Sequence, residues 1–320
     1  MIIVIQPELM ERGVFEAARR DPDLHSEYQL RFARCYDAPS PNARDEAFRR
    51  LHQEWFEGLG LRARIADCAG AFEHIRATVS RIVVAQTLPK GQAAELYGAP
   101  GNFTIALALS LTRLLEEHAF RYWAMHEFLH IDDMLDPAFA YDRTAAKAQF
   151  SNTFHDLARD RFAVLWAISV DARLEHGTGL RAGIKLPADA RPRRRSELFR
   201  VFPGTGDRDA DGLFDRVWEL LARQRPTYAD FLAWGRHGVP KLLDQLADEE
   251  FDPRPQPGAR CPSCGFPTYD WAESTALSAL PGSHGEGNAP LRRICGRCAE
   301  IRIAEASAAG RRHASSGAIA

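Results

Sequence analysis

The feature that most constrains this chain is a long segment, residues 103–135, that contains neither proline nor glycine. A breaker, Ala99-Pro100-Gly101, precedes the segment, and Pro137 follows it. A run without breakers favours helix, but this one exceeds the length of a usual globular helix. We therefore predict two helices that meet near Glu117 and His118.

The second of these helices carries the pattern His126-Glu127-Phe128-Leu129-His130. Positions i and i+4 lie on the same face of a helix, so the two histidines can reach one metal ion. Glu127 then lies beside the open position of that ion, where a general base for a water molecule is needed. The pattern predicts a zinc site with hydrolytic chemistry. The alternative is a chance match, in which both histidines are ordinary core residues.

A later segment, Asp160–His176, also has the pattern of an amphipathic helix, and Gly177 suits its C-terminal cap. Ile168, Asp171 and Glu175 follow the spacing of a single helix face. Acidic side chains are seldom buried unless they are paired or bind a metal. Asp171 and Glu175 are therefore candidates for a third zinc ligand, with ordinary salt bridges as the alternative.

In these two motifs the chain resembles the gluzincin branch of the zincin metallopeptidases, over about residues 75–180. That family combines H-E-x-x-H on one helix with two acids four residues apart on a later one, here Asp171-Ala-Arg-Leu-Glu175. The resemblance implies that Asp171 binds zinc and that Glu175 orients a histidine ligand. The acid types are exchanged relative to the family pattern, so Glu175 as the ligand stays an alternative. The resemblance also implies that the protein is a hydrolase, specifically a metallopeptidase that cleaves peptide or protein substrates with Glu127 as general base.

A second zincin branch, the metzincins, places its third ligand six residues after the second histidine, which is Asp136 here. That arrangement needs a glycine where the helix ends and the chain turns back, but position 133 is Asp. Asp136 is therefore a third candidate, ranked behind the two acids of the later helix. A further hydrogen-bond donor should stabilise the developing oxyanion, and His155 is the first candidate, with Tyr141 and His176 as alternatives.

The other informative motif lies near the C-terminus, where Cys261-Pro-Ser-Cys264 and Cys295-Gly-Arg-Cys298 form two C-x-x-C pairs. Four thiolates fill a tetrahedral zinc site and leave no open position, so we predict a structural zinc ribbon. Gly265 follows the first pair and Gly296 lies within the second, both at positions that suit left-handed backbone. Two redox dithiols or disulfides are the alternative. The chain thus predicts two bound Zn²⁺ ions, one catalytic and one structural.

The composition limits which binding partners and which cellular location we expect. Lys and Arg number 41 against 43 Asp and Glu, and the resulting net charge of −2 argues against a general nucleic-acid binder. We find no apolar run of the length of a membrane span and no signal peptide at the N-terminus. The two remaining cysteines, Cys35 and Cys68, stand alone. These features predict a cytoplasmic protein with no membrane association.

The predicted fold class is α+β and mostly helical. Residues 2–5, 78–87 and 93–97 have strand patterns, the last two joined by the turn at 88–91, which predicts a small antiparallel sheet before the H-E-x-x-H helix. Further helices are expected at 8–20, 26–36, 43–58, 62–78, 211–224, 227–235 and 240–249, and a loop at 177–196 with a basic turn at 191–195.

We divide the chain into four regions. These are an N-terminal helical region (1–75), a zincin-like metallopeptidase domain with a helical extension (76–250), a zinc ribbon (259–303) and a disordered tail (304–320). An alternative function goes with this division. In it the H-E-x-x-H site is degenerate, and the protein is a non-catalytic scaffold that binds a protein partner through the ribbon.

Overall fold

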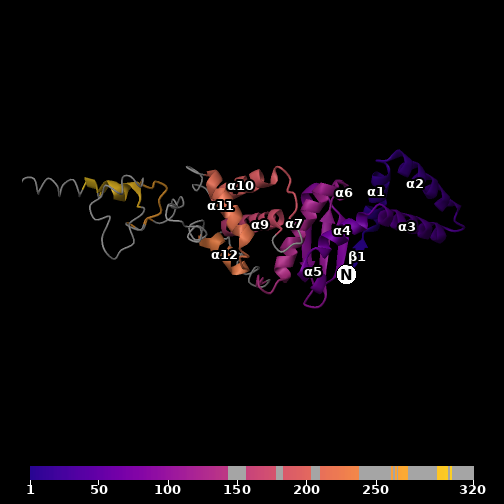
Figure 1. The fold of residues 1–320 in the computed structure, drawn as a ribbon, viewed down its shortest axis with the longest axis horizontal. Helices are drawn as coiled ribbons and strands as arrows, with labels where there is room; N and C mark the ends of the chain where they lie inside the picture. Colours follow the sequence, from indigo (N-terminus) through magenta and orange to yellow (C-terminus); the bar gives the residue numbers. More distant parts are fainter. Residues whose placement is uncertain are drawn as a thin grey trace, which may run out of the picture. The chain divides into compact units, whose positions relative to one another are not determined.

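The computed structural model describes residues 1–142, 156–177, 183–202, 210–237, 261, 264, 266–272, 294–301 and 303–304 (Figure 1). The chain divides into two compact units. The first comprises residues 1–149, 166–191 and 221–230, and the second comprises 150–165, 192–220 and 231–320. Most of the described chain is helical, and the first unit also contains a four-stranded sheet. None of the helices in the described ranges has the length and apolar character needed to cross a membrane.

The N-terminal elements agree with the predicted strand and helices. Two of the helices have a side-chain cap, because Asp21 accepts from the backbone N–H of Asp23 and Leu24, and Ser40 accepts from that of Ala43. The three α-helices of this region all begin with a proline in the first turn, where the missing N–H of proline costs nothing. The elements are β1 (Ile2–Ile5), α1 (Pro7–Ala18), α2 (Pro22–Arg34), the 3₁₀ turn η1 (Cys35–Asp37) and α3 (Pro41–Gly58).

The helix predicted over 62–78 is two helices, α4 (Leu61–Gly70) and α5 (Glu73–Thr78). Phe72, between them, has extended backbone and is 1% exposed. Burying a phenylalanine at this point takes the chain out of one helix and into the next. Both helices pack on the helix that carries the two histidines.

The sheet is mixed, which corrects the prediction of an antiparallel one. β2 (Val79–Gln86), β3 (Ala93–Tyr97) and β4 (Phe103–Leu109) join β1 in the order β1-β2-β4-β3. β1, β2 and β4 are parallel, and only β3 is antiparallel to its neighbour. β3 pairs with β4 rather than with β2, although the short 3₁₀ turn η2 (Pro89–Gly91) links it to β2. The reason is the turn after β3, where Gly98 and Gly101 adopt positive φ and bring the chain back as a hairpin.

Two helices do meet near Glu117, as predicted, but the first of them is wrong over residues 103–109. Residues 103–109 form β4, followed by α6 (Leu111–Leu115) and α7 (Glu117–Leu135). Ile105, Leu107 and Leu109 are buried and the residues between them are half-buried, which is the two-residue period of a strand. β4 lies between β2 and β3, so both of its edges are paired. The predicted helix that carries H-E-x-x-H is confirmed as α7.

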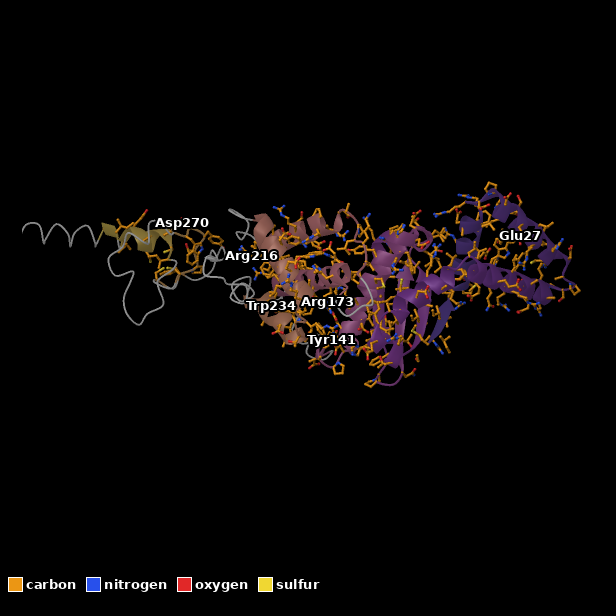
Figure 2. All side chains as sticks on the ribbon, viewed as in Figure 1. Glu27, Tyr141, Arg173, Arg216, Trp234 and Asp270 are labelled. Carbon is orange, nitrogen blue, oxygen red and sulfur yellow. The ribbon has the colours of Figure 1, made fainter. Side chains whose placement is uncertain are left out.

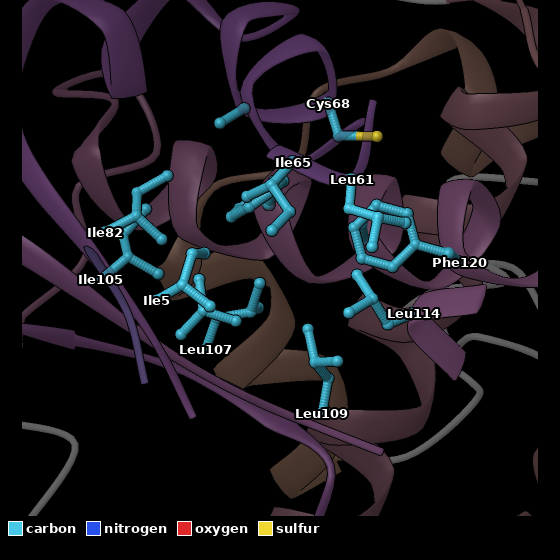
Figure 3. Packing of buried hydrophobic residues seen from close by; sticks show 14 of the residues in the cluster. Ile5, Leu61, Ile65, Cys68, Ile82, Ile105, Leu107, Leu109, Leu114 and Phe120 are labelled. Carbon is cyan, nitrogen blue, oxygen red and sulfur yellow. The ribbon is translucent and has the colours of Figure 1, made fainter. Parts of the chain in front are cut away.

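The core of the first unit lies between one face of the sheet and the helices that pack on it (Figure 3). It contains residues from both sides of position 75, so the expected N-terminal region and the segment after it share one core. The residues labelled in Figure 3 come from the strands (Ile5, Ile82, Ile105, Leu107, Leu109) and from α4, α6 and α7 (Leu61, Ile65, Cys68, Leu114, Phe120).

The later helices are α9 (Asp156–His176), α10 (Ala190–Val201), α11 (Ala210–Arg223) and α12 (Tyr228–His237). Gly177 has a φ of 72°, as expected for the residue that ends α9. The loop predicted over 177–196 is wrong from Ala190 onward, because the arginines of 191–195 belong to α10. Arginine is a good helix former, and Pro192 falls in the first turn, where it is tolerated. The helix predicted over 240–249 and the predicted tail after Ala304 lie outside the described residues.

Candidate metal sites

The two histidines of α7 point their ring nitrogens at one another. His126 Nε2 and His130 Nε2 are 3.2 Å apart, and the ring planes are almost perpendicular. Two nitrogens at this separation either share a proton or bind a common cation. Tetrahedral ligation with bonds near 2.0–2.1 Å would place them about 3.3 Å apart. The donor pair therefore fits zinc in both element and spacing.

Asp171 of α9 contacts the opposite edge of the His126 ring. Its Oδ1 lies 2.7 Å from Nδ1 of His126, and the hydroxyl of Tyr122 donates to both carboxylate oxygens at 3.0 Å. Asp171 is fully buried. A carboxylate can only accept, so Nδ1 is the protonated nitrogen and Nε2 of the neutral ring carries the lone pair. This is the arrangement in which a second residue fixes the tautomer of a metal-binding histidine.

The structure places the two acids of α9 differently from the expectation. Asp171, expected as the third ligand, lies at the Nδ1 edge of the His126 ring, whereas His130 lies at the Nε2 edge. Glu175 has a side chain that is 34% exposed, and its Oε2 is 3.7 Å from a guanidinium nitrogen of Arg191. Over the described residues, the four C-terminal cysteines are the group of three or more metal-binding side chains whose ligand atoms gather within 4.8 Å. No acid joins the histidine pair as a third ligand in that part of the chain.

Asp136, the metzincin-like alternative, also contacts other groups. Its Oδ1 lies 3.7 Å from Nε2 of His74 and accepts from the backbone N–H of Ala138 at 2.8 Å. The residue therefore ends α7 and links it to α5. His155, the expected oxyanion donor, lies outside the described residues.

Glu127, the expected general base, lies against the sheet. Its Oε2 accepts a hydrogen bond of 3.2 Å from the backbone N–H of Ala94, the second residue of β3. β3 is the outermost strand on this side of the sheet, and α7 packs on it. The contact fixes the carboxylate of Glu127 beside a strand backbone, one residue along α7 from His126.

A second network supports His130. The ring of Trp166 meets the His130 ring edge-on, with centroids 4.4 Å apart. The indole N–H of Trp166 donates to Asp133 at 2.8 Å. Arg173 of α9 (labelled in Figure 2) donates to both oxygens of the same carboxylate, at 2.8 Å from Nη1 to Oδ1 and 2.5 Å from Nη2 to Oδ2. The side chains of Arg173 and Asp133 are 7% and 8% exposed. An ion pair with so little water around it holds α9 and α7 in a fixed register.

The second candidate site is the cysteine group. One sulfur from each of Cys261, Cys264, Cys295 and Cys298 lies within 4.8 Å of the others, and all four are free thiols. The sulfurs of Cys264 and Cys295 are 3.9 Å apart, which is well beyond the length of a disulfide bond. The backbone N–H of Cys295 donates to the sulfur of Cys261 at 3.3 Å, as is common when a thiolate needs stabilisation. This group could hold a metal ion.

The glycine within the second C-x-x-C pair lacks the left-handed backbone that was expected for it. Gly296 is not among the positive-φ glycines of the described chain. Its N–H donates to the backbone carbonyl of Asp270 at 3.0 Å, and a Cβ built on it would lie 2.4 Å from the Asp270 carboxylate. The clashing atoms belong to the end of the exposed Asp270 side chain, which can move aside, so neither left-handed backbone nor packing requires glycine at this position. Gly265 lies outside the described residues.

Sequence reasoning missed three groups at the histidine site, namely Tyr122, Trp166 and the backbone of Ala94. Tyr122 could have been identified from the sequence, because it lies one helical turn before His126 on the same helix face. Trp166 and Ala94 had none, because their contacts depend on how α9 and β3 pack against α7.

Comparison of the chain with known protein families, with curated proteins and with solved structures finds no match.

Proposed function

We propose that the protein is a zinc-dependent hydrolase, and specifically a metallopeptidase. The observation that carries the proposal is the pair of Nε2 atoms 3.2 Å apart, with a buried carboxylate on the far nitrogen of His126. A chance H-E-x-x-H sequence would not require a buried acid and a tyrosine on a second helix to orient one of its histidines. The combination is typical of a metal-binding histidine and its supporting residue.

His126 and His130 would hold the ion through Nε2. Zinc bound there supplies a Lewis acid that lowers the pKa of a water molecule toward neutrality. Asp171 and Tyr122 keep His126 in the tautomer whose Nε2 is free to bind. Trp166, locked by Asp133, restricts rotation of the His130 ring.

Glu127 takes up the proton of the attacking water and returns it to the leaving amine. Its hydrogen bond from Ala94 orients the carboxylate, and a nearby outer strand of the sheet suits an extended peptide as the substrate. This nearness to strand backbone is why a peptide bond is the proposed target, rather than another hydrolysable group.

The four cysteines are proposed to hold a second Zn²⁺ with a structural role. Four thiolates complete a tetrahedral shell, so no position remains for water or substrate. Should the histidine site prove inactive, this second site favours the alternative function, a scaffold that binds a protein partner.

Glu127→Gln tests the function. The amide keeps the shape of the side chain but cannot accept a proton, so cleavage of a broad peptide library should fall by about 100-fold to 10,000-fold. The matched control is Glu117→Gln, on the same helix with a side chain that is 67% exposed, which should cleave like the wild type. Equal cleavage by Glu127→Gln and the wild type, at equal zinc content, would contradict the assignment of the base. If the zinc-loaded wild type cleaves no peptide in the library, the peptidase proposal fails.

A further inference from the structure

One face of the sheet is covered by helices, and the opposite face carries exposed apolar side chains. The strand registers place Ile2 beside Arg81, Val4 beside Val83, and Ala106 between Val83 and Glu95. Ile2, Val4 and Tyr97 on this face are 62%, 42% and 49% exposed. The members of what we call the open face are Ile2, Val4, Arg81, Val83, Ala85, Ala93, Glu95, Tyr97, Thr104, Ala106 and Ala108.

Such a face is unusual for this kind of sheet. Three of its four strands are parallel, and parallel strands are normally covered on both sides. The sequences agree, because β1 reads IIVI and the middle of β2 reads IVVA, without the polar alternation of a strand that faces water. Exposed large apolar side chains that gather on one surface mark an interaction site.

The charges of the open face identify the partner. Arg81 and Glu95 are the charged residues of these four strands, both are exposed, and they lie on different strands with β4 between them. A twofold axis near the middle of β4 would place each arginine over the glutamate of the other copy. On β4, Thr104 lies beside Arg81 and Ala106 lies beside Glu95, so only short side chains separate the two charges and the two sheets could approach closely.

We propose that the open face is the interface of a homodimer, in which two copies stack sheet on sheet. The contact is isologous, so the same two charges form two ion pairs, Arg81 with Glu95 in both directions. Four strands and three rows of side chains cover about 400 Å² per copy, below the area of a standard interface. The dimer therefore forms in a concentration-dependent way, in the micromolar range.

Charge exchange tests the pairing. Sedimentation of the wild type should show monomers at low micromolar and dimers at high micromolar concentration. Arg81→Glu and Glu95→Arg each place like charges opposite one another twice, so each variant alone should dimerise about tenfold more weakly, or not at all. Mixed in equal amounts, they regain both attractive pairs and should associate at least as well as the wild type. The matched control is Arg49→Glu on the exposed surface of α3, which should dimerise like the wild type.

Three results would overturn the proposal. The first is a wild type that stays monomeric throughout the concentration range. The second is a dimer that both single variants keep unchanged. The third is a mixture that associates no better than either variant alone. Because both substituted side chains are exposed, circular dichroism should show the wild-type fold in every sample.

Discussion

At the scale of single residues, buried charge is concentrated where α7 meets α9. Asp133 accepts from Arg173 and from the Trp166 indole, and Asp171 accepts from Tyr122 and His126. Each carboxylate is buried, and each has charged or polar donors that replace water. One acid supports each histidine, Asp171 by direct contact with His126 and Asp133 through Trp166 with His130.

Asp133→Asn should destabilise the fold strongly. The change leaves the Arg173 guanidinium buried without its counter-charge, which typically costs about 3–5 kcal/mol of unfolding free energy. Urea unfolding measures the difference. The control is Glu46→Gln, which breaks the Glu46–Arg49 pair on α3, where the side chains are 52% and 66% exposed, and should cost at most about 1 kcal/mol. Losses of equal size would show that the buried pair contributes no more than a surface pair.

Part of this arrangement could be predicted from the sequence. The spacing of Asp171 on one face of the later helix correctly indicated a buried acid near the histidines. The position of Asp171 relative to His126 could not be predicted. A carboxylate that binds the metal would lie near Nε2 of His126, whereas one that orients the ring lies at Nδ1. That depends on the offset between α7 and α9, which tertiary packing determines.

At the scale of elements, the sequence showed where most helices lie and failed where strand and helix compete. Residues 103–109 were predicted as helix because they lack breakers, yet they pair with β2 and β3 as the third strand in sheet order. Leucine and alanine favour helix, and only pairing with neighbours on both edges overrides that preference. The mixed sheet could not be inferred for the same reason, since strand order is a property of long-range contacts.

The packing of α2 on α3 gives an element-scale prediction about pH. Nε2 of His52 in α3 and the Tyr28 hydroxyl of α2 share a hydrogen bond of 3.1 Å. Burial lowers the pKa of His52, and the Glu11 carboxylate opposes this effect. A lowered pKa means that the folded state prefers the neutral ring. Its contribution to stability is therefore present above the unfolded pKa, near 6.5, and is lost as the pH falls below it.

Unfolding free energies measured from pH 8 down to pH 5 should thus fall more steeply for the wild type than for His52→Gln. Glutamine can still hydrogen-bond Tyr28 but does not titrate in this range. The control His118→Gln, at the first turn of α7, should keep the wild-type slope. Parallel curves for the wild type and His52→Gln would show that His52 has the same pKa folded and unfolded.

At the scale of the whole molecule, the two candidate metal sites belong to different compact units. His126, His130 and their supporting residues belong to the first unit, and the four cysteines belong to the second. The sites also differ in chemistry, because two imidazoles leave positions open whereas four thiolates leave none. Occupancy of one site should therefore not depend on the other.

Zinc content measures both sites at once. The wild type should bind two zinc ions per chain. A chelator should remove the ion of the histidine site much faster than the ion of the cysteine site, because a closed thiolate shell exchanges slowly. His126→Ala should abolish the fast fraction and keep the slow one, whereas Cys264→Ser should do the reverse. Cys35→Ser is the matched control, because Cys35 is a buried thiol that hydrogen-bonds the Arg31 carbonyl, outside both sites. Full zinc content in His126→Ala would show that the histidine pair shares a proton instead of a metal, and only the cysteine site would remain.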